Sequence, residues 1–372
     1  MYCIRFPAVL ALAAHACAAH ATNGMNIEGF GPVAAAMGGA SFAHDNGTAA
    51  MMNNPATLGL AADGDRVDLA LGYLGPRVSV AGQQHSDGEA YFMPAAGWTR
   101  HTGRYTYGLG VYAQGGMGTE YARGVDGLPE RSELGVGRLI APLVMNVDQK
   151  LTVGATLELV WAMLDLRMAM PITDMAGLVV EPGNGTLTGA LSGLAGAGYD
   201  HARLDFSDNN DFSGKSRGWG LAGKLGFVYR LSPQWTLGGS YHGTTRLSDL
   251  ETSAATMLVT DTGGNPAQSV PGKIAVRNFQ WPRTYGLGLA WQASPNWLFA
   301  ADWKRLDWAA NMQSFTMRYS AMGDSVAFSL PQAWRNQNVT QLGATWRATP
   351  ALSLRAGVNL ASNPVPDATM HY

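Results

Sequence analysis

Hydrophobic and polar residues alternate along most of the chain after residue 63. In 235–248, WTLGGSYHGTTRLS, the odd positions are mostly large and apolar, whereas the even positions are small or polar. The same split recurs in 66–74, 105–114, 151–163, 219–231, 285–292, 342–346 and 352–360. A period of two residues is typical of β-strands that separate two environments. The pattern therefore predicts an all-β fold, in which about eleven strands can be counted.

The lengths of these runs and of the connections between them narrow the fold class. The clearest runs span 9 to 13 residues, whereas ordinary strands average about 5–6 and tilted membrane-spanning strands need about 9–11. Tight and long connections alternate: the tight ones are 148–150, 232–234, 294–296 and 349–351, and the long ones are 116–132, 168–215 and 250–273. Outer-membrane barrels have short periplasmic turns and long outer loops. We therefore expect a transmembrane antiparallel β-barrel.

Aromatic residues stand beside the tight turns and help to orient the predicted strands. They are Tyr229, Trp235, Trp291, Trp297 and Trp346. Amphipathic rings at one end of successive strands are typical of an interfacial girdle. A soluble barrel with its apolar face inward would show the same alternation. Strand length, girdle and the export signal described next favour apolar side chains outside and polar ones in the bore.

The N-terminus has the pattern of a secretory signal peptide. Arg5 is followed by a short apolar stretch and then by small residues that end in Ala19-His20-Ala21. A charged start, a short apolar core and an A-x-A site predict cleavage after Ala21. Both cysteines, Cys3 and Cys17, lie in this predicted signal segment, residues 1–21. The mature chain is therefore expected to have no disulfide and no cysteine metal ligand.

Composition and motifs argue against several function classes. Charged residues make up only 14% of the chain, against about 25% in a typical soluble domain. The formal net charge of −2 offers no basic surface for nucleic acid. The eight histidines show no metal-ligand spacing, and no GxSxG nucleophile elbow is present. We predict no cofactor, no metal, no nucleic-acid partner and no enzyme.

Residues 22–62 do not alternate and are rich in Gly, Ala and small polar residues. A barrel with a polar bore leaks unless something fills it, and small residues pack well in a confined space. Backbone groups buried in the bore need partners. Asn53 and Asn54 can bridge such groups, and Pro55 ends any helix begun in 47–52. We expect an N-terminal hatch at 22–62 followed by the barrel at 63–372.

Several long motifs carry a resemblance to a known family. They include ATNGMNIEGFGPVAAAMGGASFAHDNGTAAMMNNPATLGL, DRVDLALGYLGP, FQWPRTYGLGLAWQASPNWLFAADWKRLDW, LPQAWRNQNV and LRAGVNLASNPVPD. The chain resembles the FadL/TodX (OmpP1-like) family of outer-membrane transporters for hydrophobic compounds over nearly all of its mature length. Asn54-Pro55-Ala56, preceded by Asn53, matches the Asn-Pro-Ala motif of the family's hatch.

The resemblance implies a barrel of about fourteen strands in the bacterial outer membrane. It also implies passive uptake of long-chain fatty acids or aromatic hydrocarbons. The ligand is captured by outer loops, reaches a pocket beside the hatch, and leaves sideways at a kinked strand after hatch movement. Because glycine marks bulges and bends, we predict this strand at Gly108, Gly110, Gly115 and Gly116. The expected surroundings are outer-membrane lipid, lipopolysaccharide and, during insertion, the barrel-assembly machinery; a monomer is expected.

The sequence departs from the family pattern in the number of strands. About eleven are visible, an odd number, whereas bacterial single-chain barrels use even ones. The chain stops at NPVPDATMHY without a final alternating strand. We therefore expect the barrel to be incomplete at its C-terminus.

Two groups of charged residues are candidate binding sites. Lys224, Arg246, Lys304 and Arg355 are placed on the bore face, where one or two could hold a fatty-acid carboxylate by charge-assisted hydrogen bonds. A generic polar bore with paired charges is the simpler explanation for any one of them. Asp205, Asp208, Asn209, Asn210 and Asp211 form an acidic cluster that suits a cation, lipopolysaccharide or a solvated turn. A surface adhesin and, less directly, a barrel lipid hydrolase remain as alternative functions.

Overall fold

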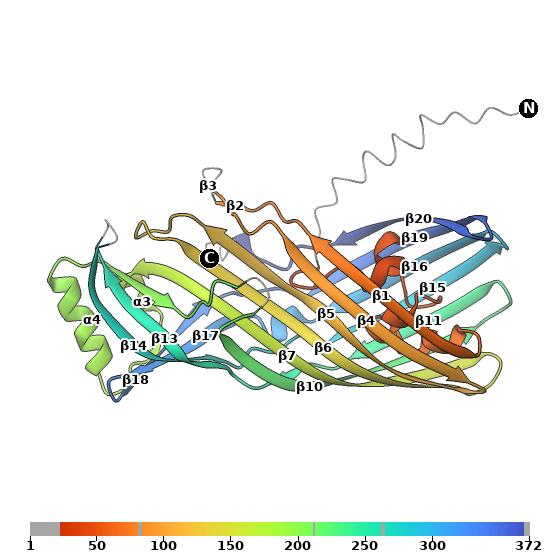
Figure 1. Ribbon diagram of the computed structural model, residues 1–372, viewed down its shortest axis with the longest axis horizontal. Coiled ribbons are helices and arrows are strands. Elements are labelled where there is room, and N and C mark those ends of the chain that lie inside the picture. The colour runs from red at the N-terminus through yellow and green to blue at the C-terminus, as the bar shows by residue number, and fades with distance from the viewer. Residues whose placement is uncertain (1–22, 81–83, 211–212, 262–264, 368–372) are drawn as a thin grey trace, which may run out of the picture.

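The computed structural model describes residues 23–80, 84–210, 213–261 and 265–367 (Figure 1). The predicted signal segment at 1–21 lies outside these ranges, as does Asp211. The main sheet has eighteen antiparallel strands and curves around the segment 23–63, hereafter the N-terminal segment (Figure 1). The prediction of an all-β transmembrane barrel is confirmed. Within the described ranges, no helix has the length and apolar character needed to cross a membrane.

The strands and helices have the following bounds. The strands are β1 Gly64–Leu74, β2 Ser79–Val80, β3 Gln84–His85, β4 Tyr91–Thr102, β5 Tyr105–Tyr121, β6 Glu130–Asn146, β7 Leu151–Pro171, β8 Val179–Glu181, β9 His201–Asp205, β10 Ser216–Arg230, β11 Trp235–His242, β12 Arg246–Leu247, β13 Leu250–Thr260, β14 Pro266–Arg277, β15 Thr284–Ser294, β16 Trp297–Leu306, β17 Ser314–Ala321, β18 Asp324–Pro331, β19 Gln337–Thr349 and β20 Leu352–Ala361. The helices are α2 Gly31–Ala36, η2 Thr48–Met51, η3 Pro55–Leu60, α3 Ile172–Gly177, α4 Thr186–Gly196 and η4 Trp308–Ala310.

The wall at the tight-turn end consists of antiparallel neighbours. Their order is β1, β4, β5, β6, β7, β10, β11, β15, β16, β19 and β20. The registers end with β1 on β4 at one side and with β20 on β19 at the other. This order gives the eleven wall strands that the alternation predicts.

The opposite end of the barrel is built from β9, β13, β14, β17 and β18. Strands β13, β14, β17 and β18 continue β11, β15, β16 and β19 beyond breaks at 243–249, 278–283, 307–313 and 332–336. Strand β9 pairs with β7 and β13. The prediction of a long loop at 250–273 is wrong, because most of this range is the hairpin of β13 and β14. The breaks interrupt the alternation, so the outer strands do not read as continuations in the sequence. Helices α3 and α4 cover this end (Figure 1).

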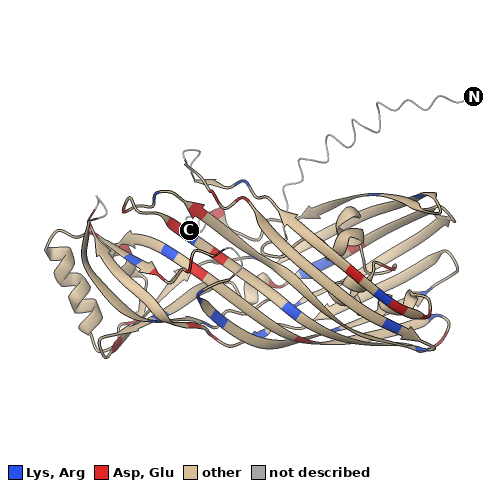
Figure 2. Ribbon diagram, viewed as in Figure 1, with Lys and Arg blue, Asp and Glu red and all other residues tan. Residues whose placement is uncertain are grey.

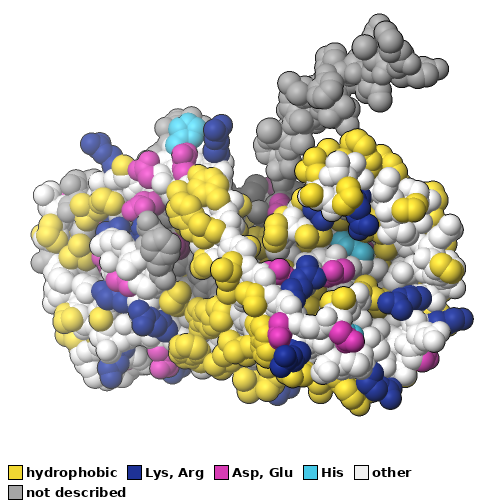
Figure 3. Space-filling view, turned by 45° about the vertical axis from the view of Figure 1, so that its right-hand side comes forward, with side chains coloured by type: hydrophobic (Ala, Val, Ile, Leu, Met, Phe, Trp, Pro, Cys, Tyr) yellow, Lys and Arg dark blue, Asp and Glu magenta, His cyan; other side chains and the backbone are white. Residues whose placement is uncertain are grey.

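The apolar faces of the strands point outward. Leu69, Leu157 and Leu225 are 79%, 66% and 61% exposed. Their neighbours Glu158 and Lys224 are buried in the bore. Figure 3 shows hydrophobic side chains spread over the visible wall, and Figure 2 shows the charges of β1, β4, β5 and β6 gathered mainly toward the strand ends. A surface that exposes large apolar side chains in this way suits lipid.

An aromatic ladder crosses the wall beside the tight turns, where the sequence predicts a girdle. Trp235 stacks on Trp291 with ring centroids 5.4 Å apart, and Trp297 stacks on Trp346 at 5.8 Å. Phe299 joins the two pairs, with centroids 5.7 Å from both Trp291 and Trp297. The rings are partly exposed. Such a ladder is suited to the membrane interface.

The expectation of a polar bore is correct for only half of the barrel. Along the inward face of β7, Thr152, Thr156 and Glu158 are followed by Val160 and then by further buried apolar residues. These further residues are Ala162, Leu164 and Leu166. They belong to a continuous apolar cluster that reaches from the N-terminal segment to α4. The bore is therefore polar beside the N-terminal segment and apolar toward the long-loop end.

Candidate binding site inside the barrel

Asn54 fixes the N-terminal segment to itself and to the wall. Its side-chain oxygen accepts the backbone N–H of Ala56 at 3.1 Å and so caps η3. Its amide nitrogen donates to the backbone carbonyls of Phe42 at 2.7 Å and Phe227 at 2.9 Å. One side chain therefore joins two turns of the segment to β10, because it satisfies three buried backbone groups.

Asn53 and Pro55 also shape the segment. The Asn53 amide accepts from the Phe30 N–H at 3.2 Å, and donates to the Phe30 carbonyl and to Asn46 at 2.9 Å. Pro55 is the first residue of η3, a position where its missing N–H costs nothing. The sequence predicts only that Pro55 ends a helix; in the structure it separates η2 from η3 and begins the second. Ala56 is fully buried.

Wall side chains of β10 and β16 hold the backbone of the N-terminal segment. The Lys224 ammonium donates to the carbonyl of Met52, and that of Lys304 donates to the carbonyl of Glu28 at 2.8 Å. The Asp302 carboxylate accepts from the N–H groups of Ser41 at 2.6 Å and Phe42 at 2.9 Å. Two residues predicted to bind a ligand carboxylate, Lys224 and Lys304, therefore serve the N-terminal segment.

Inward-facing glycines let the N-terminal segment approach the wall closely. A Cβ at Gly238 would lie 1.8 Å from the carbonyl oxygen of Phe42, and one at Gly226 would lie 2.0 Å from the side-chain oxygen of Asn54. Both distances are far below van der Waals contact. The high glycine content of the strands thus has a specific use here, which is room for a second layer of backbone.

A buried ionic network lies next to the N-terminal segment. Arg138 of β6 donates to Glu158 at 2.5 Å and to Thr245 at 2.7 Å. It also donates to Gln114. His242 lies 3.1 Å from the Glu158 carboxylate. Because Arg138 and Glu158 are about 1% exposed or less, their charges need this mutual pairing.

A polar cavity of about 60 Å³ lies between the network and the N-terminal segment. Its lining includes Asn53, Arg138, Lys224, Ser240 and Lys304. One water molecule needs a cavity of roughly 10–15 Å³. The polar cavity can therefore hold a few water molecules and is too small for an acyl chain. The polar cavity is therefore part of the packing of the N-terminal segment.

The other two predicted bore cations lie elsewhere. The prediction that Arg246 faces the bore is wrong, because its side chain is exposed and its neighbour Thr245 is buried. Lys224 pairs with His242, but Leu221 pairs with Arg246, so the β11–β12 side contains one extra residue. Such a bulge exchanges the two faces of the strand. Arg355 pairs with Thr345 on β19 and is exposed.

The predicted kinked strand is β5, and its irregularity lies at Gln114–Gly115. Ala113 pairs with Gly137 and Gly115 with Val136, which leaves Gln114 as an extra, bulged residue. Gly115 has φ of 153°, and a Cβ there would lie 2.1 Å from the Met25 carbonyl. Gly116 donates its N–H to that carbonyl at 3.0 Å. The bulge therefore bends β5 onto the N-terminal segment. Gly108 and Gly110 lie before it, in the regular part that pairs with β4.

Beyond the bulge, β5 leaves its neighbour β4. The ladder between them ends at Ala95 and Tyr112, although β4 itself begins at Tyr91. The segment before β4 and the end of β5 meet again where the Asp87 N–H donates to the Glu120 carbonyl at 2.8 Å. The interrupted stretch between these two points is hereafter the wall interruption. A cavity of about 90 Å³ lies at its outer end.

An aromatic cluster faces the bulge across the bore. Its main members are Trp281, Trp308 and Trp334, all buried. The centroids of Trp281 and Trp308 are 5.6 Å apart, and those of Trp308 and Trp334 are 5.2 Å apart, with interplanar angles of 66° in both pairs. Phe279 and Phe315 extend the cluster. These edge-to-face contacts form an apolar wall next to the N-terminal segment.

The three tryptophans all come from the strand breaks. Trp281 lies in the break 278–283, Trp308 in η4 and Trp334 in the break 332–336. Pro282 lacks the N–H that a strand ladder needs, and Asn278 and Ala333 have positive φ of 56° and 50°. The chain therefore dips inward at these points. The alternation pattern predicts neither this cluster nor Arg138. The sequence signal for the cluster is a Trp that stands beside Pro282 or in a polar stretch without alternation.

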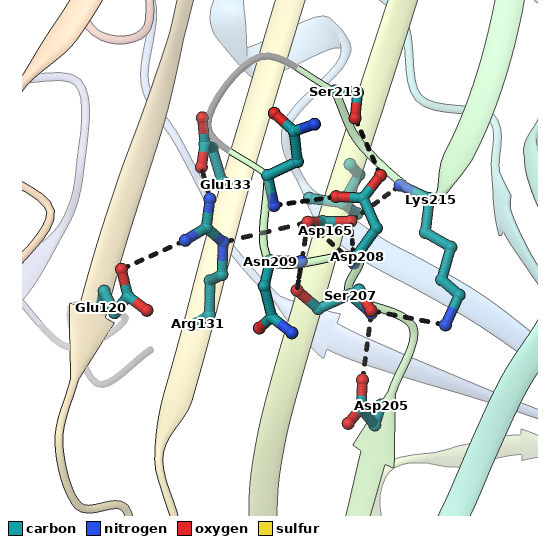
Figure 4. A network of polar contacts seen from close by, with 12 residues as sticks. Glu120, Arg131, Glu133, Asp165, Asp205, Ser207, Asp208, Asn209, Ser213 and Lys215 are labelled. Carbon is teal, nitrogen blue, oxygen red and sulfur yellow. Dashed lines mark hydrogen bonds and ion pairs between the residues drawn. The ribbon is translucent and has the colours of Figure 1, made fainter.

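The acidic cluster near the long-loop end is internally bonded. Figure 4 shows Arg131 between Glu120 and Glu133, and Asp165 beside Ser207, Asp208 and Lys215. Asp165 accepts from the Ser207 hydroxyl at 3.1 Å and from the Lys215 N–H at 2.7 Å. Asp208 accepts from the Ser213 hydroxyl at 2.8 Å. In the part of the chain that the structure describes, no group of three or more His, Cys, Asp or Glu residues is placed to hold a metal ion.

Comparison with known proteins places the chain among outer-membrane transporters. The family model described as outer membrane protein transport protein (OMPP1/FadL/TodX) matches residues 8–371. The toluene transporter TbuX of Ralstonia pickettii is 32% identical, with 91% of this chain and 88% of that one covered and a TM-score of 0.80. The Pseudomonas putida toluene transporter TodX is 29% identical, with 93% and 87% covered and a TM-score of 0.80.

More distant and shorter matches agree with this placement. The CymD monoaromatic hydrocarbon channel is 27% identical, with 91% and 85% of the two chains covered and a TM-score of 0.76. A Pseudomonas aeruginosa FadL homologue, 15% identical with a TM-score of 0.66, shares the fold. A Chlorobium limicola protein encoded 5′ of a phosphoenolpyruvate carboxykinase gene is 59% identical over 46 residues, which is 12% of this chain and 23% of that protein.

Proposed function

Because this chain belongs to the OMPP1/FadL/TodX family of outer membrane transport proteins, we propose that it is a passive outer-membrane channel for hydrophobic compounds. The ligand enters between the outer loops, moves along the apolar half of the bore, and reaches the aromatic cluster above the N-terminal segment. It then leaves sideways through the wall interruption into the membrane. The N-terminal segment is the hatch in this proposal.

The observation that carries the proposal is the continuous apolar interior. The cluster begins at Leu187 of α4, continues through Leu164 and Val160 of β7, and ends at Met25 beside the β5 bulge. In a membrane barrel, lipid covers the outer apolar face. A second apolar face that points inward must therefore contact something other than lipid. Apolar ligands supply that contact, because burial of their surface against such a lining is favourable.

The position of the wall interruption supports a sideways exit. It lies directly after the bulge at Gln114 and Gly115, where β5 contacts Met25. The apolar cluster and the interruption therefore meet at the same residue, Met25. A hydrophobic compound that leaves here enters the bilayer and does not have to cross the polar half of the bore. The polar network of Arg138 and Glu158 stays in place.

We favour monoaromatic hydrocarbons over long-chain fatty acids as the substrates. Lys224 and Lys304 donate to backbone carbonyls of the N-terminal segment and so are occupied by contacts other than a ligand carboxylate. The aromatic cluster offers flat apolar surfaces of a size that suits single rings. The relatives TbuX, TodX and CymD, at 27–32% identity, are toluene or monoaromatic hydrocarbon transporters by name.

The proposal is of a channel and not of an enzyme, as its relatives are transport proteins. The exposed apolar face of the wall suits outer-membrane lipid and lipopolysaccharide. We expect insertion by the barrel-assembly machinery and action as a monomer, since one barrel contains both the apolar interior and the wall interruption.

Uptake by whole cells tests the function. Labelled toluene and labelled oleate are supplied to a Gram-negative host that lacks such a transporter, with and without the gene. We expect the gene to accelerate toluene uptake and to leave oleate uptake unchanged. Faster uptake of oleate alone would contradict the substrate class, and equal rates for both compounds would contradict the channel.

A further inference from the structure

We propose that the cluster of Trp281, Trp308 and Trp334 binds neutral aromatic compounds that carry a hydrogen-bond acceptor, such as an aryl ketone, in preference to plain hydrocarbons. This inference rests on the proposed function, because the ligand reaches the cluster through the same apolar interior. It adds a chemical class to the substrates and assigns the preference to particular indole N–H groups.

The three tryptophans contribute three indole N–H donors, and only one of these has an acceptor among the described residues. The Trp281 indole N–H donates to the side-chain oxygen of Asn26 at 3.0 Å. The indole nitrogens of Trp308 and Trp334 are buried and have no acceptor among the described residues. A buried donor without a partner is costly, and buried indole N–H groups usually have one. Two such donors in one cluster of rings indicate a site where an acceptor binds.

The turn Asn23–Asn26 occupies the space in front of these rings. Gly24 has a positive φ of 66°, and a Cβ there would lie 3.0 Å from both the Nε1 and the Cε2 of Trp308. Asn23 and Met25 are buried as well. The turn therefore presses its backbone against the Trp308 indole edge but gives it no hydrogen bond. A ligand that displaces the turn meets that edge.

Asn26 acts as a stand-in for the acceptor of a ligand. Its side-chain oxygen receives the Trp281 indole N–H and, at 3.4 Å, the side-chain amide of Gln114. Both donors become free when the turn leaves. The ligand's acceptor can then take the place of the Asn26 oxygen, with Trp308 and Trp334 as additional donors in the same cluster.

The charge around the cluster selects neutral ligands. The cluster itself consists of Trp and Phe rings, which provide no counter-ion for a carboxylate or an amine. The nearby guanidinium of Arg138 is paired with Glu158. A ketone, aldehyde, ester or nitro oxygen accepts hydrogen bonds without a net charge. A site that donates to a substrate oxygen discriminates against the analogue that lacks it.

Matched ligands and matched variants test the preference. Acetophenone and ethylbenzene have the same carbon skeleton, and only acetophenone has an acceptor. Their binding to the full chain in lipid nanodiscs is measured by equilibrium dialysis, for the wild type and for Trp308→Phe and Trp334→Phe. Each variant keeps an aromatic ring and loses the N–H. Trp303→Phe, an exposed indole of β16, is the control.

We expect Trp308→Phe, Trp334→Phe or both to weaken acetophenone binding about threefold to tenfold, with ethylbenzene binding and the control unchanged. Each ligand is compared with itself, so partition into the lipid cancels. The carbonyl stretch of ¹³C-labelled acetophenone should move to lower frequency on binding to the wild type and less so in the affected variant. Equal losses for both ligands, or no loss for acetophenone, would overturn the inference. The channel function is tested separately by toluene uptake into cells. Uptake of toluene would support the channel even if the acceptor preference is overturned.

Discussion

The side-chain amide of Asn54 donates a hydrogen bond of 2.9 Å to the backbone carbonyl of Phe227 and so joins the N-terminal segment to the middle of β10. Its other bonds are to Phe42 and Ala56 within the segment. This small amide therefore holds the segment in the bore together with Lys224, Lys304 and Asp302. If the segment moves during transport, this contact is one of those that must break.

Asn54→Ala should loosen the N-terminal segment. The change removes the cap of η3, worth about 0.5–2 kcal/mol, and leaves buried carbonyls without donors. A loss of one or two kcal/mol corresponds to a change of roughly 5–30-fold in the open fraction. We expect maleimide to label a cysteine placed at the buried Ala50 roughly 5–30-fold faster in Asn54→Ala than in the chain with Asn54.

The control for this experiment is Asn296→Ala, in the tight turn between β15 and β16, which should leave the labelling rate unchanged. The predicted absence of other thiols in the mature chain makes the labelled site unique. If Asn54→Ala labels no faster than the wild type, the amide does not hold the segment.

Gly238→Val should displace the N-terminal segment by a different route. The new Cβ would lie 1.8 Å from the Phe42 carbonyl oxygen, and overpacking of this kind costs about 1–3 kcal/mol. The wall strand β11 is held by two neighbours, so the segment is the part that has to move. Ion conductance in planar bilayers should increase as the bore opens. Gly135→Val is the matched control, since a Cβ at Gly135 meets nothing within 4 Å; a similar conductance for both variants would contradict the close contact.

The outer loops should depend on the pair of Asp126 and Arg203. Two hydrogen bonds of 2.8 and 2.5 Å join them, and both side chains are buried. Burial raises the pKa of Asp126, but the hydrogen bonds from Arg203 and the Leu128 N–H outweigh it and hold the pKa below its usual value. The charged form is therefore the bound form.

The pH dependence follows from this direction. A carboxyl whose pKa is lowered on folding contributes stability above its unfolded pKa of about 3.9, and loses it as the pH falls through the folded pKa. Protease resistance of the loop 122–129 should thus stay constant from pH 7 to about pH 4 and decrease only below. Asp126→Asn should destabilise the loop by about 3–5 kcal/mol between pH 7 and about pH 4, because a buried pair is broken. Glu251→Gln, an exposed carboxyl of β13, should behave like the wild type.

Strand type and outward orientation could be predicted because alternation depends only on the local sequence. The odd positions of 151–159 are apolar and outward, and Glu158 and Lys224 face the bore as expected. The predicted glycines of β5 include the residue beside the bulge, Gly115. The number of wall strands also follows from counting the runs.

The rest of the site depends on distant parts of the chain. The bulge before Arg246 exchanges the faces of its strand, and no local pattern shows where an extra residue falls. Trp281, Trp308 and Trp334 meet only because three strand breaks lie at the same level. Lys224 lies in the bore as predicted, but its partner is a backbone carbonyl 172 residues away, which residue types alone do not identify.

The most direct test of a sideways exit is the uptake of labelled toluene by cells that produce the deletion of Gln114. This residue is the extra one in the bulge, so its removal lets β5 pair regularly with β6 and allows β4 to pair beyond Tyr112. Gln114→Ala is the control, because it removes the side-chain bonds to Asn26 and Arg138 and keeps the bulge. With equal amounts of folded protein in the outer membrane, the deletion should reduce uptake to the level of cells without the gene, while Gln114→Ala retains most of it. Wild-type uptake by the deletion variant would contradict the account.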